Sequence, residues 1–376
     1  MRLTQRPKTL SWHRCSTASN LTKFNERENT IMKHKLAIIM ALFAVFAFSA
    51  NAASAEESKP KVIRIGSAYA SGYGKPYGFG NAGVLQARGL LEEEFRKEGI
   101  KIEWYLFKGA GPAVNESLAN KLLDFVYEGD LPAIVAKAGG LKTKLLAAGS
   151  KWANVYIAVP ADSKISSIKD LRGKRVGVFK GTNIQLTLDR ILEANGLKES
   201  DLRIYNLGTA DLQNALKTKD VDAAVSGVNL FTLQSQGNSR IIYSTKTAPK
   251  DWRTTGAFYV TEDFAKKYPE ITKRVVKDYV KASVWASDEA NRNGYLQVGV
   301  NSGYSRADQS VEIAGRTLKD VNDVTLDSDF LNHLVGAIAI SKQKGLIRNT
   351  YDLNTWVDRS YLDAALKELN LEHFWK

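Results

Sequence analysis

Cysteine is almost absent from this sequence of 376 residues: the one cysteine, Cys15, lies in an N-terminal stretch that we expect to be removed. The remaining chain therefore has no thiol nucleophile and no disulfide framework. Histidine is also scarce, and only His333 and His373 lie outside that stretch, far from one another in the sequence. Because no Cys/His metal site can be assembled from them, we predict neither a metal nor another cofactor.

Long runs of one charge are absent as well. The chain carries 53 basic and 40 acidic residues, a formal charge of +13, but the two signs are mixed along the sequence. Such mixing is typical of solvated surfaces and argues against a nucleic-acid partner, although a mildly positive protein still gathers anions. With 44% hydrophobic residues at this length, the chain is large enough for two domains around a substantial core.

Residues 1–55 are predicted to be a leader that contains a signal peptide at about 32–55. Basic residues follow Met32, and 36–48 form an apolar run of 13 residues, too short to span a bilayer comfortably. Two small-x-small cleavage patterns come next, Ala50-Asn51-Ala52 and Ala53-Ser54-Ala55. We expect translation to start at Met32; the alternative is a genuine long N-terminal region before it.

The chain is organised around Gly173–Gly196. Within it, Arg175–Phe179 is a Val-rich run typical of a buried parallel strand. Asn183–Asn195 has apolar residues along one helical face, at Ile184, Leu188, Ile191 and Leu192. A strand that leads through a glycine turn into a helix presents free backbone amides and the positive end of the helix dipole. This pattern predicts an anion site at the loop Gly181-Thr182-Asn183.

Thr182 has a second interpretation. With Gln185 it forms a T-x-x-Q pattern, which is typical of a capping box, so that its side chain would only cap its own helix. The sequence leaves both interpretations open, and the backbone donors remain available in either case.

The predicted first strand, Val62–Gly66, is followed by the loop Ser67–Gly83, which is rich in glycine and tyrosine. This loop contains a G-x-G-x-x-G pattern, but its first glycine lies too far from the strand end for a dinucleotide site. Tyr69 and Tyr73 are instead predicted to line a ligand cleft; the alternative is that they pack over the sheet edge. A helix is expected over Ala82–Lys97.

Further along, the hydrophobic pattern predicts alternating strands and helices, and therefore an α/β fold with mainly parallel sheets. One strand is expected over Ala147–Val159, through Trp152. Asp130 suits a helix start, so it is either a plain cap or a ligand contact. The other strands are expected at 101–107, 124–127, 202–207, 223–225, 240–244 and 256–260, and helices near the C-terminus at 271–292, 326–344 and 361–370.

Two segments of the chain, Asn115–Gly129 and Gln213–Gly227, resemble each other at a constant offset of 98 residues. Each has the pattern of a helix, a short buried strand, a glycine and a polar site. Unless this internal repeat arises by chance, it indicates two similar lobes, with Gly129-Asp130 facing Gly227–Asn229 across a cleft. The matched pairs are Leu118 and Leu216, Lys121 and Lys219, Asp124 and Asp222, and Gly129 and Gly227.

With these motifs in this order, the sequence resembles the periplasmic substrate-binding proteins of ABC importers for aliphatic sulfonates, taurine and nitrate. Segments 123–138, 168–196 and 210–229 carry the resemblance, which extends from about Val62 to the C-terminus. It implies a type II periplasmic binding fold, in which two lobes of helices around mainly parallel sheets are joined by two hinge crossovers. Lobe one is expected at 60–155 and 254–376, and lobe two at 156–253.

Two features depart from the family. The Ser67–Gly83 loop is longer and richer in glycine and tyrosine, and Gly227-Val228-Asn229-Leu230 stands where the family has an aromatic-Asp-Pro pattern. Both departures fall on the pocket that the resemblance implies. The residues expected to line that pocket are Gly129, Asp130, Gly181, Thr182, Asn183, Gly227 and Asn229.

The resemblance implies an exported, periplasmic and monomeric solute-binding protein. It is expected to capture a small organic anion, first of all an aliphatic sulfonate, between lobes that close like a hinge, and to deliver it to an ABC permease in the inner membrane. The tyrosines of the first loop and Trp152 would cover the organic tail. Arg253 would either add positive charge or be a solvated connector residue.

Other functions remain as alternatives. The same binding fold could take an aromatic sulfonate, a sulfate ester, nitrate or a pyrimidine precursor of thiamine. A related desulfinase enzyme relies on a cysteine nucleophile, and a thiamine-precursor synthase on reactive His and Cys residues. The chain beyond residue 55 lacks cysteine, so we expect no enzyme.

Overall fold

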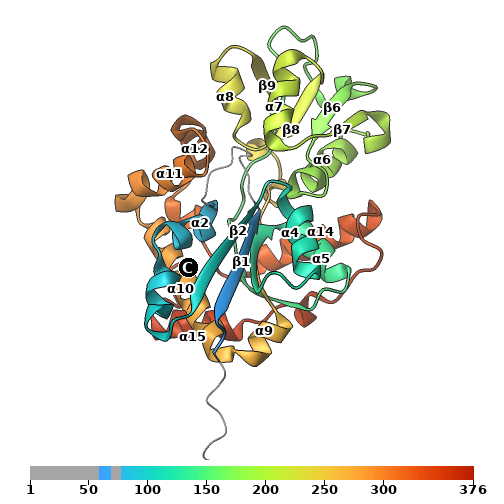
Figure 1. Ribbon diagram of the computed structural model, residues 1–376. Coiled ribbons are helices and arrows are strands. Elements are labelled where there is room, and N and C mark those ends of the chain that lie inside the picture. Colours follow the sequence, from blue (N-terminus) through green and yellow to red (C-terminus); the bar gives the residue numbers. More distant parts are fainter. Residues whose placement is uncertain (1–58, 69–77) are drawn as a thin grey trace, which may run out of the picture. The chain divides into compact units, whose positions relative to one another are not determined.

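The computed structural model describes residues 59–68 and 78–376. The predicted leader and signal peptide, and the loop residues Tyr69 and Tyr73, lie outside the described residues. The described chain forms two five-stranded sheets with helices packed against them (Figure 1). The predicted class, α/β with mainly parallel sheets, is confirmed.

The first sheet has the strand order β2-β1-β3-β10-β4. Three strands, β1 (Val62–Ala68), β2 (Lys101–Phe107) and β3 (Phe125–Gly129), are parallel. Strand β10 (Gly256–Thr261) runs antiparallel between β3 and β4 (Thr143–Ala148). The inner strands are almost entirely buried and apolar, as expected for a sheet covered on both faces.

The second sheet has the order β7-β6-β8-β5-β9. Here β6 (Arg175–Val178), β7 (Arg203–Asn206) and β8 (Ala223–Ser226) are parallel, while β5 (Tyr156–Pro160) is antiparallel to β8 and β9 (Ser239–Ser244). Each sheet thus places its first parallel strand between the next two along the chain. In both sheets one antiparallel strand lies second from an edge.

Helices connect these strands and continue to the C-terminus, with short 3-10 turns between several of them. The first half has α2 (Gly80–Ala87), α3 (Leu90–Phe95), α4 (Ala110–Ala119) and α5 (Asp130–Ala138), and the second half has α6 (Asn183–Ala194), α7 (Thr209–Thr218) and α8 (Leu230–Ser235). After β10 follow α9 (Glu262–Lys267), α10 (Pro269–Ser287), α11 (Arg292–Asn301), α12 (Arg306–Ile313), α13 (Leu318–Val321), α14 (Ser328–Gln343) and α15 (Ser360–Glu368).

The chain crosses from the first sheet to the second between Ala148 and Tyr156, and returns between Ser244 and Gly256. The two crossing segments are paired: the Ala153 amide donates to the Thr254 carbonyl oxygen, and the Thr254 amide to the Ala153 carbonyl oxygen, both at 2.9 Å. The residue limits expected for the two lobes stay predictions.

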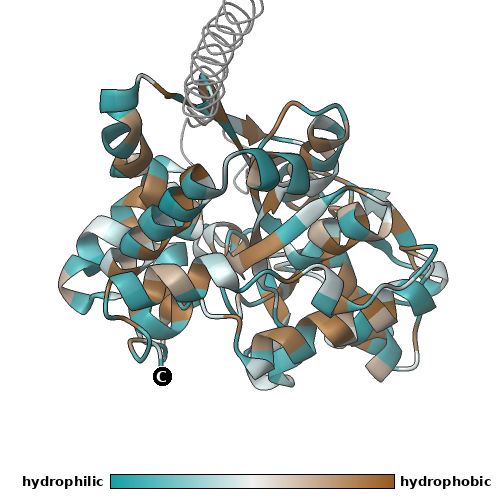
Figure 2. Ribbon diagram, turned by 90° about the horizontal axis from the view of Figure 1, so that it is seen from below, coloured by the Kyte–Doolittle hydropathy of each residue, from teal (hydrophilic) through white to brown (hydrophobic). Residues whose placement is uncertain are grey.

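Each sheet has its own apolar core. The first sheet and the C-terminal helices share one cluster, in which Phe258 stacks on Tyr279 at 4.3 Å between ring centroids. The second sheet has one cluster around Val176 and Ile191 and another around Leu212 and Leu216. Figure 2 shows mainly hydrophobic residues on the strands, while the surrounding helices alternate between hydrophobic and hydrophilic residues. No helix among the described residues is both long and apolar enough to cross a membrane.

Two expected elements are wrong in their extent. The helix expected over Ala82–Lys97 divides into α2 and α3 because Gly89 adopts φ +59°, a left-handed conformation that no helix continues through. The strand expected over Ala147–Val159 is interrupted at Trp152, which adopts φ +62° in the first crossover. The central strand and helix are confirmed as β6 and α6.

Candidate functional site

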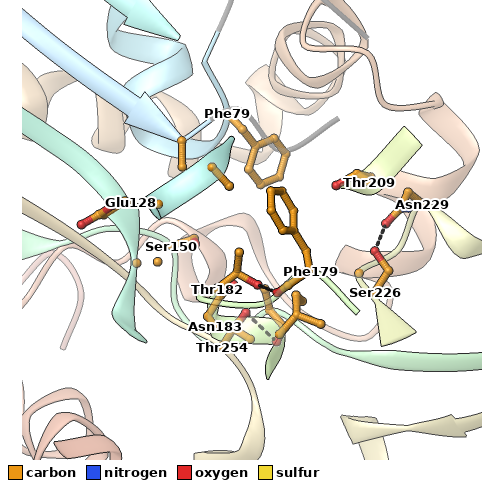
Figure 3. A pocket seen from close by; sticks show the side chains of 18 of the residues that line it. Phe79, Glu128, Ser150, Phe179, Thr182, Asn183, Thr209, Ser226, Asn229 and Thr254 are labelled. Atoms are coloured by element: carbon orange, nitrogen blue, oxygen red, sulfur yellow. Dashed lines mark hydrogen bonds between the residues drawn. The ribbon is translucent and has the colours of Figure 1, made fainter. Parts of the chain in front are cut away.

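A cavity of about 200 Å³ is lined by residues from both sheets and from both crossing segments. It lies at the carboxyl ends of the parallel strands, where the loops of β1, β3, β6 and β8 meet. This is the position at which open α/β sheets bind ligands. Figure 3 shows several of its lining side chains.

Helix N-termini converge on this cavity. Its lining includes the first residues of α4, the cap and first residue of α6, the first residue of α7, and the cap of α5. The caps of α2 and α8 also line it. The first amides of α5 and α8 are engaged by other parts of the chain, as in the contact of the Asp130 amide with the Thr255 carbonyl oxygen. A helix N-terminus still carries a partial positive charge, so the cavity favours an anion even without a cationic side chain. The lining residues concerned are Phe79, Ala110, Gly111, Gly129, Thr182, Asn183, Thr209 and Asn229.

The loop before α6 does not form the capping box that is one of the two interpretations of Thr182. The Thr182 hydroxyl donates to the Phe179 carbonyl oxygen at 2.7 Å, and caps no amide of its helix. The Gln185 side chain instead accepts from the Gly181 amide at 2.8 Å. Of the three amides expected to hold an anion, that of Gly181 is therefore occupied. Those of Thr182 and Asn183 have no acceptor among the described residues.

Gln185 is held in place by a second contact, because its amide nitrogen donates to Glu199 at 2.8 Å. Glu199 also pairs with Lys180 at 3.0 Å. These contacts tie the loop to the segment after α6, and Gly181 itself adopts φ +74°, the left-handed conformation that the turn requires. The sequence pattern therefore identified the loop correctly, and of the two interpretations left open for Thr182 the capping box with Gln185 does not form.

The part of the chain built around the first sheet and the part built around the second sheet, called the first and second half below, approach each other closely at this loop. A Cβ atom on Gly129 would lie 2.9 Å from the side-chain amide of Asn183, and one on Gly181 would lie 2.8 Å from Pro112. Glycine is needed at both positions for steric reasons. Elsewhere in the lining, the Ser226 hydroxyl donates to the Asn229 side-chain oxygen at 2.9 Å. The Asn229 side-chain nitrogen is buried and has no partner among the described residues.

Of the residues expected at the site from the sequence, Gly129, Thr182, Asn183, Gly227 and Asn229 line the cavity. Asp130, Trp152, Gly181 and Arg253 are not among its lining residues. The role of all of them as ligand contacts stays a prediction, as it does for Tyr69 and Tyr73, which are not described.

Asp130 is buried beside the cavity and bound to other parts of the chain. Its carboxylate lies 2.7 Å from His333 Nε2 and accepts from the Thr255 hydroxyl at 3.2 Å. Burial acts to raise the pKa of Asp130, but the contact with His333 and the nearby charge of Arg190 outweigh it and lower that pKa. Asp130 therefore ties helix α5 to the return crossover and to α14.

Trp152 and Arg253 stabilise the crossing segments. The Trp152 ring meets His333 edge-on at 5.4 Å, and the Lys250 ammonium lies 4.5 Å from its centroid. The Arg253 guanidinium donates to the carbonyl oxygens of Thr245 and Lys246. Both side chains are thus engaged in contacts within the chain.

The sequence reasoning missed two acids in the lining, Glu128 and Glu312. Burial raises the pKa of Glu128 to about 8, although the Tyr259 hydroxyl donates to it at 2.5 Å. Burial also raises the pKa of Glu312, which accepts from the Asn154 amide at 2.9 Å. No sequence signal marked Glu312, because it reaches the cavity from helix α12, far along the chain.

No lysine, arginine or histidine is among the lining residues that the structure describes. No group of three or more potential metal ligands occurs in the described ranges either. The cavity therefore combines neutral donors, helix N-termini and apolar walls, with the aromatic side chains of Phe79, Tyr127, Phe179 and Tyr304.

Comparison with known proteins gives consistent matches. A family model described as NMT1/THI5 like matches residues 94–291. A Bacillus subtilis (strain 168) protein, provisionally named an aliphatic sulfonates-binding protein, is 26% identical over 90% of this chain and 98% of its own. A crystal structure from Methylobacillus flagellatus KT, provisionally a periplasmic sulfonate-binding protein SsuA, is 33% identical with a TM-score of 0.73. It covers 84% of this chain and 97% of its own. The predicted periplasmic binding fold is thereby confirmed.

The same fold also occurs in an enzyme. The crystal structure of the desulfurization enzyme DSZB matches 82% of this chain and 99% of its own, with a TM-score of 0.63 and 17% identity. At that identity the likeness concerns the fold alone. The chemistry must therefore be argued from the residues of the cavity.

Proposed function

The chain belongs to the NMT1/THI5-like family, and we propose that it is a solute-binding protein that captures a small organic anion in the cavity between its two sheets. One observation carries this proposal: N-termini of several helices converge on a cavity whose described lining holds no cationic side chain. An anion is then bound by neutral amides and helix dipoles.

The head group is held at the start of α6. The amides of Thr182 and Asn183 are free to donate, and the helix that follows has 12 residues, long enough to carry a substantial dipole. Glu128 stands close to this site but does not oppose an anion at neutral pH, because its pKa is raised to about 8 and the carboxyl stays largely protonated. The Asn229 side-chain nitrogen is a further donor.

We propose an aliphatic sulfonate as the first ligand to test. The names of the relatives support this choice, since they describe sulfonate-binding proteins. The signal peptide predicted at about 32–55 would export the chain to the periplasm, where a monomer would deliver its ligand to an ABC permease of the inner membrane. The lobes, proposed at 60–155 with 254–376 and at 156–253, would close about the paired crossing segments.

We propose no enzymatic reaction for this chain. The lining residues include no cysteine, and Cys15 precedes the predicted cleavage sites. The acids Glu128 and Glu312 are engaged with Tyr259 and Asn154, respectively.

The test uses the full sequence expressed in a bacterial host, with the protein purified from the periplasmic fraction. A thermal-shift screen compares ethanesulfonate, hexanesulfonate, taurine, sulfate, nitrate and a pyrimidine, each in excess. A ligand present at about 100 times its Kd stabilises a protein by about 2.7 kcal/mol, which raises Tm measurably. We expect at least one sulfonate to do so. If no sulfonate raises Tm and only uncharged or cationic compounds do, the proposed function is wrong.

A pair of variants tests the backbone donor. Asn183→Pro removes one amide, and proline is tolerated at this first helical position because Thr182 before it is extended, with ψ 165°. Asn183→Ala removes the same side chain but keeps the amide. Because a hydrogen bond to a charged group contributes about 1.5–3 kcal/mol, we expect Asn183→Pro to weaken sulfonate binding by roughly tenfold to hundredfold relative to Asn183→Ala in titration calorimetry. Equal affinities of the two variants would rule out this amide as a ligand donor.

A further inference from the structure

The cavity has an aromatic feature that an anion site by itself does not require. Figure 3 shows the side chains of Phe79 and Phe179 pointing toward one another within it. Phe79 precedes α2 and Phe179 follows β6, so each half of the chain supplies one ring. We propose that these rings form a subsite for an aromatic tail, so that arylsulfonates are ligands of this protein. The inference rests on the proposed function, because it assumes that the head group is a bound sulfonate.

Phe79 is held in position before any ligand arrives. Its ring lies 4.8 Å from that of Tyr304, tilted by 42°. Its carbonyl oxygen accepts from the Gly83 amide at 3.2 Å, and the amide of the preceding Gly78 donates to Gln86 at 2.9 Å. The Ser302 hydroxyl donates to the Gly78 carbonyl oxygen. A ring whose backbone and face are fixed in this way loses little freedom when a ligand packs on it.

Phe179 is fixed by the anion loop itself. The Thr182 hydroxyl donates to its carbonyl oxygen at 2.7 Å, and the amide of the next residue, Lys180, donates to the Asn206 side chain at 3.0 Å. The edge of the Phe179 ring lies 4.0 Å from the position that a Cβ atom on Gly208 would take. Thr182, which directly precedes α6, thus also holds the backbone of Phe179 in place. The proposed head-group site and the Phe179 ring therefore belong to one rigid loop.

Several other side chains of the cavity lining are apolar. Ile184, Leu212, Val225 and Val228 line the same cavity. Burial of apolar surface alone would serve an alkyl and an aryl tail about equally. Aromatic pairs in offset or edge-on contact gain about 0.5–1.5 kcal/mol beyond the area that they bury. Two phenylalanine rings from opposite sides therefore favour an aromatic tail over a saturated one of the same size.

The experiment compares benzenesulfonate with cyclohexanesulfonate, which has the same head group and the same number of carbon atoms. Titration calorimetry with the periplasmic protein should show benzenesulfonate binding about threefold to tenfold more tightly. Ethanesulfonate serves as the ligand without a ring, and benzoate as the ring with another head group.

Two variants assign the preference to the rings. Phe179→Leu and Phe79→Leu keep an apolar side chain, and each should reduce the preference for benzenesulfonate to within about twofold of cyclohexanesulfonate, measured as the ratio of the two affinities in the same variant. Phe374→Leu, which alters an aromatic side chain packed on Trp375 outside the cavity lining, is the matched control and should keep the preference. Upfield shifts of the bound benzenesulfonate protons in NMR, smaller in either cavity variant than in the unaltered protein, give a second measurement.

The outcomes separate this inference from the proposed function. If ethanesulfonate binds but benzenesulfonate does not exceed cyclohexanesulfonate, the sulfonate site stands and the aromatic subsite is wrong. The same holds if both leucine variants fold, by their circular dichroism, yet keep the preference. If no sulfonate binds, both proposals fall together.

Discussion

The two halves of the molecule build the same unit from different residues. In the first, the Arg64 guanidinium on β1 donates to Asp124 at 2.7 and 3.0 Å, and the Arg64 amide donates to the same carboxylate at 2.9 Å. In the second, Arg175 on β6 makes the same three contacts with Asp222, at 2.8, 3.3 and 2.8 Å. Each pair joins the first parallel strand of a sheet to the segment that enters the third. The repeat found in the sequence at an offset of 98 residues is therefore structural and not chance.

The likeness extends to the turn before each carboxylate. Lys121 adopts φ +58° and Lys219 φ +65°, and the carbonyl oxygen of each accepts from the arginine of its own half. A glycine two residues beyond each arginine, Gly66 or Gly177, lies against a leucine side chain that a Cβ atom would strike. The shared unit thus ends in two glycines, Gly129 and Gly227, that line the cavity.

The halves differ just before those glycines. Glu128 lies in the first half where Ser226, 98 residues later, lies in the second. Glu128 is buried against Tyr259, whereas Ser226 donates to Asn229 beside the cavity. A repeated scaffold therefore presents a largely protonated acid on one side and an amide on the other. The scaffold positions the site, and these unmatched residues give it its chemistry.

The largest expected effect comes from making Glu128 uncharged. Its pKa is 4.5 in the unfolded chain and about 8 in the folded protein, so the folded state holds the proton more tightly. The stabilisation that comes from the protonated Glu128 carboxyl is complete below pH 4.5. It is lost as the pH rises from there to about 8. Each pKa unit corresponds to about 1.4 kcal/mol, so the loss across this window is on the order of several kcal/mol. Glu128→Gln should remove it, as measured by urea unfolding at pH 5 and pH 8.

A second buried acid, Asp189, should account for part of the pH dependence that remains in Glu128→Gln. Burial and the charge of Glu199 raise the pKa of Asp189 on α6 to about 7, so Asp189 also costs stability as the pH rises. Asp189→Asn should remove a smaller part of the pH dependence than Glu128→Gln, and the part removed should end near pH 7. An unchanged slope in Glu128→Gln would show that this carboxyl ionises normally in the folded protein.

The sequence predicts what is local and misses what depends on distant partners. The loop between β6 and α6 follows from one strand, one glycine and one apolar helical face, so it was predicted correctly. Asp130 suited a cap or a ligand contact, yet it meets His333, 203 residues away, which no local pattern reveals. The sequence pattern predicts one strand over Ala147–Val159, through Trp152. The positive φ of Trp152 is set by the crossover between the two sheets.

The aromatic lining is predicted in part. The aromatic residues of the Ser67–Gly83 loop, Phe79 among them, are expected to line a cleft, and Phe79 does line the cavity, whereas the sequence pattern treats Phe179 only as the end of a strand. No local pattern pairs Phe179 with Phe79, because only the meeting of the loops after β1 and β6 at one cavity brings the two rings together.

The next effect in size concerns the two Arg–Asp pairs. The Asp124 side chain is 8% exposed and that of Asp222 is 29% exposed, so the first pair is the more deeply buried. Removing one partner of a buried pair costs about 3–5 kcal/mol, whereas a partly exposed one costs less. We expect Asp124→Ala to lower the free energy of unfolding by about 3 kcal/mol and Asp222→Ala by about 1–2 kcal/mol.

Urea unfolding at pH 7 measures both variants. Glu372→Ala, at an exposed position, is the control and should change the free energy of unfolding by about zero. An equal or larger loss in Asp222→Ala would contradict the ranking by burial. It would indicate that the second half is the less stable one, with the whole protein limited by that sheet.

The smallest effect is a gain in stability at the two left-handed lysines. The left-handed conformation costs a residue with a Cβ atom roughly 1 kcal/mol, whereas glycine adopts it freely. Glycine also raises the entropy of the unfolded chain, which offsets part of that gain in stability. Lys121→Gly should therefore stabilise by about 0.5 kcal/mol, a rise in Tm of roughly 1–2 °C. Lys219→Gly should gain less, because Lys219 also pairs with Asp162 at 2.6 Å. Alanine at either position keeps the Cβ atom and should give no gain. If alanine stabilises as much as glycine, backbone strain is not the cause.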